Sequence, residues 1–92
     1  MFVQMITNTA KAGHENAYLA ASQRFAADMG TVQGCVASYV WQAVDDSAVV
    51  VNVNLWESAE ACAADDGSVF LAHKAELKPH FAGNVTTMYE VR

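Results

Sequence analysis

Two asparagines and a tryptophan alternate along an apolar stretch of the sequence and carry hydrogen-bond donors that could act on a bound molecule. Asn52, Asn54 and Trp56 are spaced by two within residues 48–56. In a strand, this spacing places the three side chains on one face, with Asn52 and Trp56 about 13 Å apart along the axis. Amide and indole N–H groups can donate to an oxygen that gains negative charge. The structural alternative stays open: the amides would be satisfied by neighbouring backbone, and Trp56 would anchor the core.

The three histidines are the residues that could transfer protons near neutral pH. His73 falls in a predicted helix and could accept a proton if it faced a pocket; an exposed or capping role is the alternative. His14 precedes a predicted helix and is expected to face solvent, and His80 follows Pro79 in a loop without an evident partner. Because no carboxylate lies at ligand spacing from a histidine pair, the sequence predicts no metal site.

Large apolar residues recur at spacings of three and four, which favours one buried face of a helix. Tyr18, Phe25 and Met29 follow this pattern within residues 14–29. We expect them to form core first and the wall of a pocket second, together with Phe70 from a later helix.

The elements that must position these residues follow from alternation, helical periodicity and turn residues. We expect helices over residues 14–29, 59–64 and 68–78, and strands over residues 2–9, 35–44, 48–56 and 84–91. A polar connection at residues 45–47 predicts a hairpin between the two middle strands. The βαββαβ order is that of α+β, ferredoxin-like folds. It predicts a single domain over residues 1–92, with an antiparallel four-strand sheet and two helices on one face.

Both faces of the predicted middle strands are apolar, and two helices can cover only one of them. In the strand over residues 35–44, one face is expected to carry Cys35, Ala37, Tyr39 and Trp41. In the next strand, Val49, Val51 and Val53 oppose Val50 and Trp56. An antiparallel sheet with one solvated face should be apolar on the other face only. Since 53% of only 92 residues are hydrophobic, we predict a homodimer that packs sheet against sheet.

Composition argues against several classes of partner. The formal net charge of −5, with five basic and ten acidic residues, disfavours nucleic acid. No apolar run approaches the roughly 20 residues of a membrane span. Residues 1–10 lack the pattern of a secretory signal, so we expect a cytoplasmic protein. Cys35 and Cys62 lack CxxC spacing and are expected to be reduced structural thiols.

Several short motifs, taken in order, resemble the antibiotic biosynthesis monooxygenase (ABM) family. They are Lys11-Ala-Gly-His-Glu15, Gly34-Cys35, Asn52-Val-Asn-Leu-Trp-Glu-Ser58, Ser68-Val-Phe70 and Met88-Tyr-Glu-Val91. Each motif is short, but their order and spacing cover nearly the whole chain. The resemblance implies a dimeric α+β barrel, in agreement with the two-sided sheet.

The resemblance also implies a reaction. Polyketide-tailoring members of the family oxidise anthrone-type substrates to quinones with O₂ and no cofactor, and relatives act on quinols. Their asparagine four positions before a strand-end tryptophan corresponds to Asn52 and Trp56. The implied function is a cofactor-independent monooxygenase for a small hydroxylated aromatic, with Asn52 and Trp56 polarising the substrate and His73 as base. Substrate contacts would come from Tyr18, Phe25, Met29, Asn54, Cys62 and Phe70.

Two positions depart from the tailoring enzymes and keep other functions open. The tyrosine six residues after the tryptophan is replaced by Cys62, and the arginine of the last helix falls near His73. These departures favour the alternative of a non-catalytic dimeric module that binds a small ligand. A haem-binding or haem-degrading relative is a third interpretation. Its first-strand asparagine and second-helix tryptophan would fall near Ile6 and Asp65, which are the wrong residue types for haem.

Overall fold

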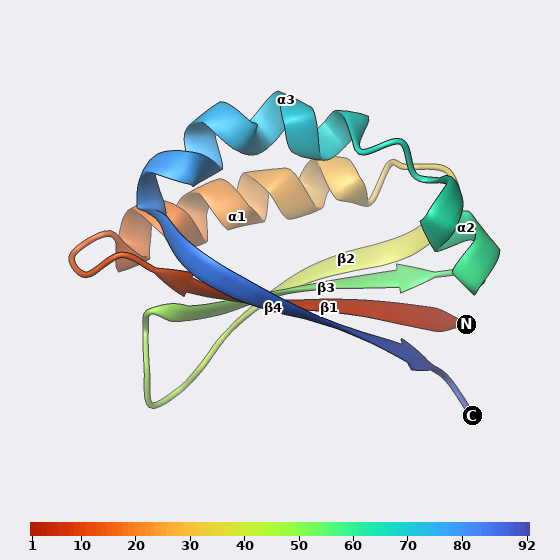
Figure 1. Ribbon diagram of the computed structural model, residues 1–92, viewed down its shortest axis with the longest axis horizontal. Coiled ribbons are helices and arrows are strands. Elements are labelled where there is room, and N and C mark those ends of the chain that lie inside the picture. Colours follow the sequence, from red (N-terminus) through yellow and green to blue (C-terminus); the bar gives the residue numbers. More distant parts are fainter.

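The elements follow the predicted order, with the helices on one side of a four-stranded sheet (Figure 1). The computed structural model describes all residues from 1 to 92. Its elements are β1 (Phe2–Ala10), α1 (Glu15–Met29), β2 (Cys35–Gln42), β3 (Val49–Trp56), α2 (Ala59–Ala64), α3 (Ser68–Leu77), a 3₁₀ turn (Lys78–His80) and β4 (Phe81–Glu90). The ferredoxin-like prediction is therefore confirmed. The second strand ends two residues earlier than expected, and the last begins three residues earlier.

The sheet order is β2-β3-β1-β4, and every neighbouring pair is antiparallel. The central pair sets the register of the polar residues: Asn54 lies opposite Gln4, and Asn52 lies opposite Ile6. On the other side of β1, Asn8 pairs with Asn84 of β4. The two central strands therefore bring several side-chain amides onto the face that the helices cover.

A β-bulge at the start of β2 makes one prediction wrong. Cys35 pairs with Trp56, but the register then shifts and Ala37 pairs with Leu55. An extra residue in one strand reverses which side chains face the core. Cys35 consequently lies on the helix side and is buried, whereas Ala37 lies on the opposite face.

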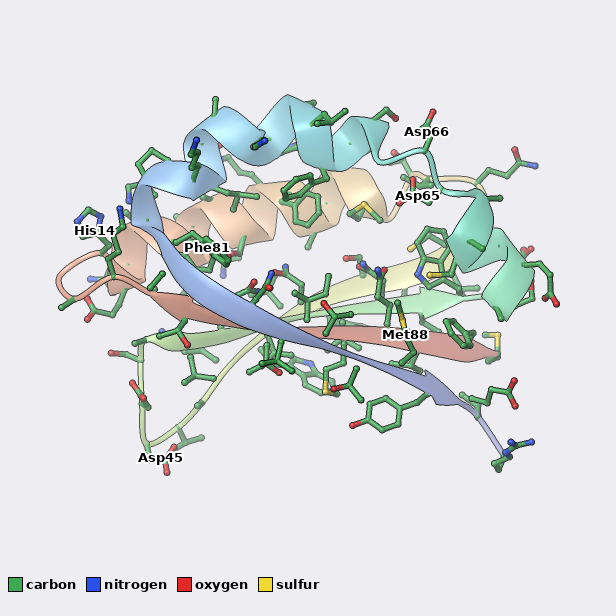
Figure 2. The ribbon with its side chains drawn as sticks, viewed as in Figure 1. His14, Asp45, Asp65, Asp66, Phe81 and Met88 are labelled. Atoms are coloured by element: carbon green, nitrogen blue, oxygen red, sulfur yellow. The ribbon has the colours of Figure 1, made fainter.

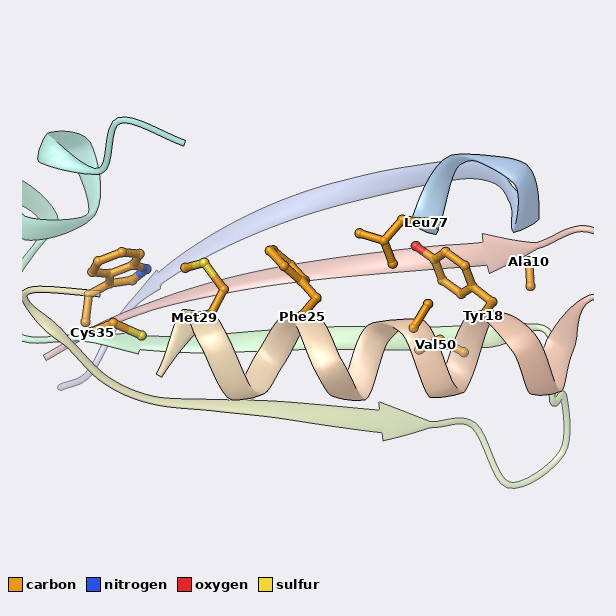
Figure 3. Packing of buried hydrophobic residues seen from close by; sticks show 9 residues of the cluster. Ala10, Tyr18, Phe25, Met29, Cys35, Val50 and Leu77 are labelled. Atoms are coloured by element: carbon orange, nitrogen blue, oxygen red, sulfur yellow. The ribbon is translucent and has the colours of Figure 1, made fainter. Parts of the chain in front are cut away.

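The core lies between α1 and the sheet (Figure 3). Tyr18, Phe25 and Met29 extend from α1 over the strands, as their helical spacing predicts, and all three are buried. Val50 and Trp56 of β3 are fully buried beneath them. None of the helices combines the length and hydropathy needed to span a membrane.

The contact of α2 with the start of β2 depends on a glycine. Gly34 has φ +84°, and a Cβ there would lie 2.8 Å from the Cβ of Ala61. Only glycine combines this backbone conformation with so close an approach. At the start of α2, Ser58 accepts a hydrogen bond from the backbone N–H of Ala61 at 3.1 Å. The contact of Gly34 with Ala61 and the cap by Ser58 therefore fix where α2 lies against the start of β2.

The two terminal histidines of the helical layer are in contact, contrary to the sequence-based expectation. His14 Nδ1 and His80 Nδ1 lie 2.9 Å apart, and both side chains are half-buried. His14 ends the turn after β1, and His80 ends the 3₁₀ turn before β4. The sequence could not reveal the pair because the two residues are 66 positions apart.

Candidate active site

A cavity of about 450 Å³ lies between the helices and the sheet. Its apolar walls come from α1, α3 and the start of β4, and comprise Tyr18, Phe25, Met29, Phe70, Leu77 and Phe81. Phe81 lies towards the His14 end of the molecule and Asp65 towards the other end (Figure 2). Such a cavity, largely apolar with a few polar groups, has the character of a small-molecule site.

The floor of the cavity is mainly polar, because Gln4, Asn8, Asn52 and Asn54 line it together with Ile6. Asn8 fixes the first pair. Its Nδ2 donates to the carbonyl oxygens of Ile6 at 3.1 Å and Val50 at 3.0 Å, and to Asn52 Oδ1 at 2.9 Å. Two backbone acceptors require the nitrogen of Asn8 at this position. Asn52 must therefore turn its oxygen to Asn8.

This orientation leaves the amide nitrogen of Asn52 free. Asn52 is 4% exposed, and its Nδ2 has no hydrogen-bond partner in the chain. A buried donor without a partner costs about 1–3 kcal/mol. Because Asn52 lines the cavity, an acceptor atom on a bound molecule would remove this cost.

A second amide is oriented in the same way by Trp56. The indole Nε1, which can only donate, donates to Gln4 Oε1 at 3.2 Å, and Asn54 Nδ2 donates to the same oxygen at 3.1 Å. Asn54 Oδ1 in turn accepts from Ser38 Oγ at 2.7 Å. With its oxygen held by two donors, Gln4 keeps only its Nε2 for other contacts. The floor therefore offers donors from Gln4 and Asn52.

Trp56 acts from behind the floor. It is fully buried and is not among the residues that line the cavity. The expected common face of Asn52, Asn54 and Trp56 is confirmed by their register with β1. Asn52 and Asn54 reach the cavity, whereas Trp56 reaches it only through Gln4.

Two other predicted site residues lie outside the cavity. His73 Nε2 is 2.5 Å from Asp28 Oδ2 on α1, and its ring centroid is 5.6 Å from that of Phe25. His73 thus joins α3 to α1 and does not line the cavity. Cys62 packs against the core from α2, where burial raises the pKa of its thiol.

Tyr18 contributes a phenolic hydroxyl to the cavity wall, and its side chain is buried. Burial is the larger influence on it and raises its pKa above the ordinary value of 10.0. The phenol is thus protonated near neutral pH and can donate a hydrogen bond. A buried neutral phenol is a poor base, so Tyr18 belongs with the donors of the site.

Several cavity residues were not identified from the sequence. Gln4 and Asn8 lie on one face of β1, the face that pairs with Asn52 and Asn54 of β3. The only signal for them in the sequence is that they occupy alternate positions of the first strand. Lys74, Lys78 and Asn84 line the cavity through the packing of α3 and β4 against β1. No local pattern indicates that packing. No group of three or more histidine, cysteine or acidic side chains is arranged to hold a metal ion.

The family model for antibiotic biosynthesis monooxygenases matches residues 1–81, which is most of the chain. The chain belongs to the antibiotic biosynthesis monooxygenase family. No curated protein gives a significant sequence match.

Solved structures carry the same fold over nearly their whole length. A candidate antibiotic biosynthesis monooxygenase from Nitrosomonas europaea superposes with a TM-score of 0.86 at 16% identity, covering 99% of this chain and 98% of that one. Another from Deinococcus radiodurans has a TM-score of 0.81 at 22% identity, with 100% and 93% covered. A third, from Bordetella bronchiseptica, has a TM-score of 0.83 at 15% identity, with 99% and 97% covered. At these identities, the likeness is one of fold.

In this ABM domain, the asparagine and tryptophan of β3 have different surroundings. Asn52 lines the cavity and its amide nitrogen has no hydrogen-bond partner, whereas Trp56 holds Gln4 in place from the core. The two residues therefore contribute to the same polar floor by different routes.

Proposed function

We propose that this chain is a cofactor-independent monooxygenase that oxidises a hydroxylated aromatic of the quinol or anthrone type with O₂. Membership of the ABM family supports a monooxygenase. The observation that carries the proposal is the unpartnered Nδ2 of Asn52, buried in the polar floor of a cavity whose walls are apolar.

The proposed reaction needs a substrate that forms an electron-rich anion. For an anthrone-type methylene, loss of a proton to solvent water gives the enolate, and its ring carbon forms a bond to O₂. The peroxide anion formed in this way takes a proton back from water. The resulting hydroperoxide loses water, which leaves a carbonyl group. One oxygen atom thus enters the product, and the other leaves as water with the two hydrogens of the methylene.

The residues of the floor suit the first step. As the substrate loses its proton, negative charge grows on its oxygen, and preorganised donors stabilise such charge most in a water-poor site. Asn52 Nδ2 is such a donor, and Gln4 Nε2 and the Tyr18 hydroxyl are further donors among the residues that line the cavity. The aromatic walls, including Phe25 and Phe70, would hold the ring. We give His73 no part in this step, because it pairs with Asp28 outside the cavity.

Substitution of Asn52 tests the proposal. Oxygen uptake would be measured with a panel of quinols and anthrones, after subtracting the uncatalysed rate. Asn52→Ala should lower kcat about 100- to 1,000-fold, as expected for loss of one donor to a developing oxyanion. Its folded stability should change little, since Asn8 keeps its two carbonyl acceptors. Asn16→Ala, at an exposed position of α1, is the matched control and should keep full activity.

The alternative function is a non-catalytic module that binds a small ligand in the same cavity. It is favoured by the placement of His73 and Cys62 outside the cavity, because no histidine is left to take the substrate proton. In that case, oxygen uptake would never exceed the uncatalysed rate, and Asn52→Ala would weaken ligand binding alone. That outcome would overturn the monooxygenase.

We also propose that the chain works as a homodimer, joined through the sheet face that the helices leave open. Tyr39, Trp41, Val85 and Tyr89 lie on that face and are about half-exposed or more. Contiguous apolar patches of several hundred square ångströms usually mark an interface. The open face is therefore the natural surface for a second copy.

A further inference from the structure

Two lysines stand at the edge of the cavity where α3 meets β4. Lys74 and Lys78 both line the cavity, and both are exposed. They are four residues apart, in the last turn of α3 and the 3₁₀ turn that follows it. Leu77 lies between them in sequence and is buried in the core. Asn84 of β4 lines the same cavity, so this edge is polar.

Neither lysine is neutralised within the chain. Arg24 pairs with Glu76, and Arg92 pairs with Glu90, but no carboxylate lies within 4.0 Å of Lys74 or Lys78. Two of the five basic residues of an acidic chain thus stand unpaired beside one cavity. Moreover, like charges at positions i and i+4 of a helix destabilise it. An anion between the two ammonium groups would relieve that repulsion.

The one carboxylate in the cavity lining lies at the other end. Asp65 precedes α3, which runs from there towards the Phe81 end of the molecule (Figure 2). Asp65 Oδ1 accepts a hydrogen bond from the backbone N–H of Gly67 at 3.2 Å, within its own turn. Between the two ends lies the floor with the free Nδ2 of Asn52. The cavity therefore has a donor floor and one positively charged end.

We propose that the substrate of this cavity is a hydroxylated aromatic acid, whose carboxylate is held by Lys74 and Lys78 while its hydroxyl oxygen lies on Asn52. The inference rests on the proposed function, because it places the hydroxylated aromatic in the same cavity. It adds a second recognition group and makes the two lysines specificity-determining residues. Neutral quinols would enter the same cavity but would leave the lysines without a partner.

Binding of two matched probes tests the inference without any oxygen chemistry. The first probe, 6-hydroxy-2-naphthoate, carries its hydroxyl and carboxylate at opposite ends of the ring system, and 2-naphthol lacks the carboxylate. Isothermal titration near neutral pH and at low salt should give a Kd about 10-fold lower for the naphthoate, the size expected for two exposed ion pairs. The preference should largely vanish at about 1 M salt, where the Debye length is only about 3 Å.

Lysine variants identify the groups responsible. The double variant Lys74→Gln/Lys78→Gln should bind both probes equally, with its affinity for 2-naphthol unchanged. Lys11→Gln, which removes a charge at an exposed position outside the cavity lining, should keep the preference. Circular dichroism would show that the variants stay folded.

The outcomes separate this inference from the proposed function. Equal affinity of the native protein for both probes, or no binding of either, would overturn the inference. So would a preference that survives the double lysine variant. If the native protein prefers the naphthoate but no phenolic substrate drives oxygen uptake, the proposed ligand class is supported and the proposed monooxygenase activity is overturned. If neutral quinols are oxidised while the two probes bind equally, the proposed monooxygenase activity is supported and the proposed carboxylate site is overturned.

Discussion

At the scale of single residues, the site depends on side chains whose hydrogen bonds leave no choice of orientation. Asn8 is tied to two backbone carbonyls, which turns the oxygen of Asn52 towards Asn8 and leaves the amide nitrogen of Asn52 without a partner. Trp56 can only donate, which turns Gln4 in the same sense. Two unrelated anchors thus produce the same result, a floor of donors. Such a floor favours ligands with an anionic or carbonyl oxygen over ligands that bring N–H groups.

Tyr18 gives the site a measurable response to alkaline pH. Burial raises its pKa, so above about pH 10 the unfolded chain releases the phenol proton while the folded chain retains it. The folded state then binds more protons, and the free energy of unfolding falls as pH rises. Tyr18→Phe should weaken this pH dependence of the free energy of unfolding. Below about pH 9 the phenol is protonated in both states, so Tyr18 contributes nothing to the pH dependence there. Urea unfolding of both proteins between about pH 8 and 11 measures the difference.

The cysteines do not obscure this comparison. Burial also raises the pKa values of Cys35 and Cys62, but both thiols are present in the native protein and in the variant. Their contribution therefore cancels in the difference between the two curves. Parallel curves over the whole range would contradict the assignment to Tyr18.

Sequence reasoning identified the part of the cavity lining that follows from strand alternation and helical spacing. Asn52, Asn54 and the walls Tyr18, Phe25 and Met29 lie where strand and helix periodicity place them. What periodicity cannot supply is the partner of each polar group. His73 was a candidate base from its residue type, but Asp28, 45 positions away, holds it between the helices.

At the scale of elements, the βαββαβ order and the helix bounds could be predicted because strong local signals mark them. Ser58 caps α2, Gly67 separates α2 from α3, and Pro79 follows the end of α3. The bulge between Cys35 and Ala37 has no such signal, since it arises from pairing with β3. A single extra residue there reversed the predicted face of Cys35. Element identity was therefore easier to predict than side-chain direction.

The close contact between the start of β2 and α2 should make the stability of the fold sensitive to substitution of Gly34. Gly34 and Gly67 both have positive φ, but only at Gly34 would a Cβ meet another atom within 4 Å. Gly67→Ala should lower the free energy of unfolding by about 1–2 kcal/mol through backbone strain alone. Gly34→Ala should cost at least about 1 kcal/mol more, because the new methyl group overlaps Ala61. Denaturant unfolding measures both losses.

A double-mutant cycle isolates the steric part of the cost at Gly34. In an Ala61→Gly background, the overlapping Cβ is gone, so Gly34→Ala should cost no more than Gly67→Ala does. An undiminished cost in that background would show that the contact between Gly34 and Ala61 does not set the cost of the substitution.

At the scale of the whole molecule, the two faces of the sheet have different tasks. One face, under α1 and α3, carries the polar floor and the cavity. The other carries Val3, Met5, Val51 and Leu55 on the central strands, flanked by exposed aromatic residues of β2 and β4, and no element of the chain covers it (Figure 1). Part of the high hydrophobic fraction of this short chain thus lies on a surface that one copy alone leaves in water.

Association of two copies should remove that exposure, and a charge on the open face should prevent it. Trp41 is 51% exposed on β2, whereas Leu71 is 64% exposed on α3, on the opposite side of the molecule. The native chain should sediment at twice its own mass at micromolar concentration. Trp41→Lys should shift it towards the monomer, because burying an unpaired ammonium group in an apolar interface is costly. Leu71→Lys adds the same charge away from the interface and should leave the dimer intact. A native chain that sediments as a monomer at every concentration, or equal effects of the two lysines, would show that the open face is not where copies meet.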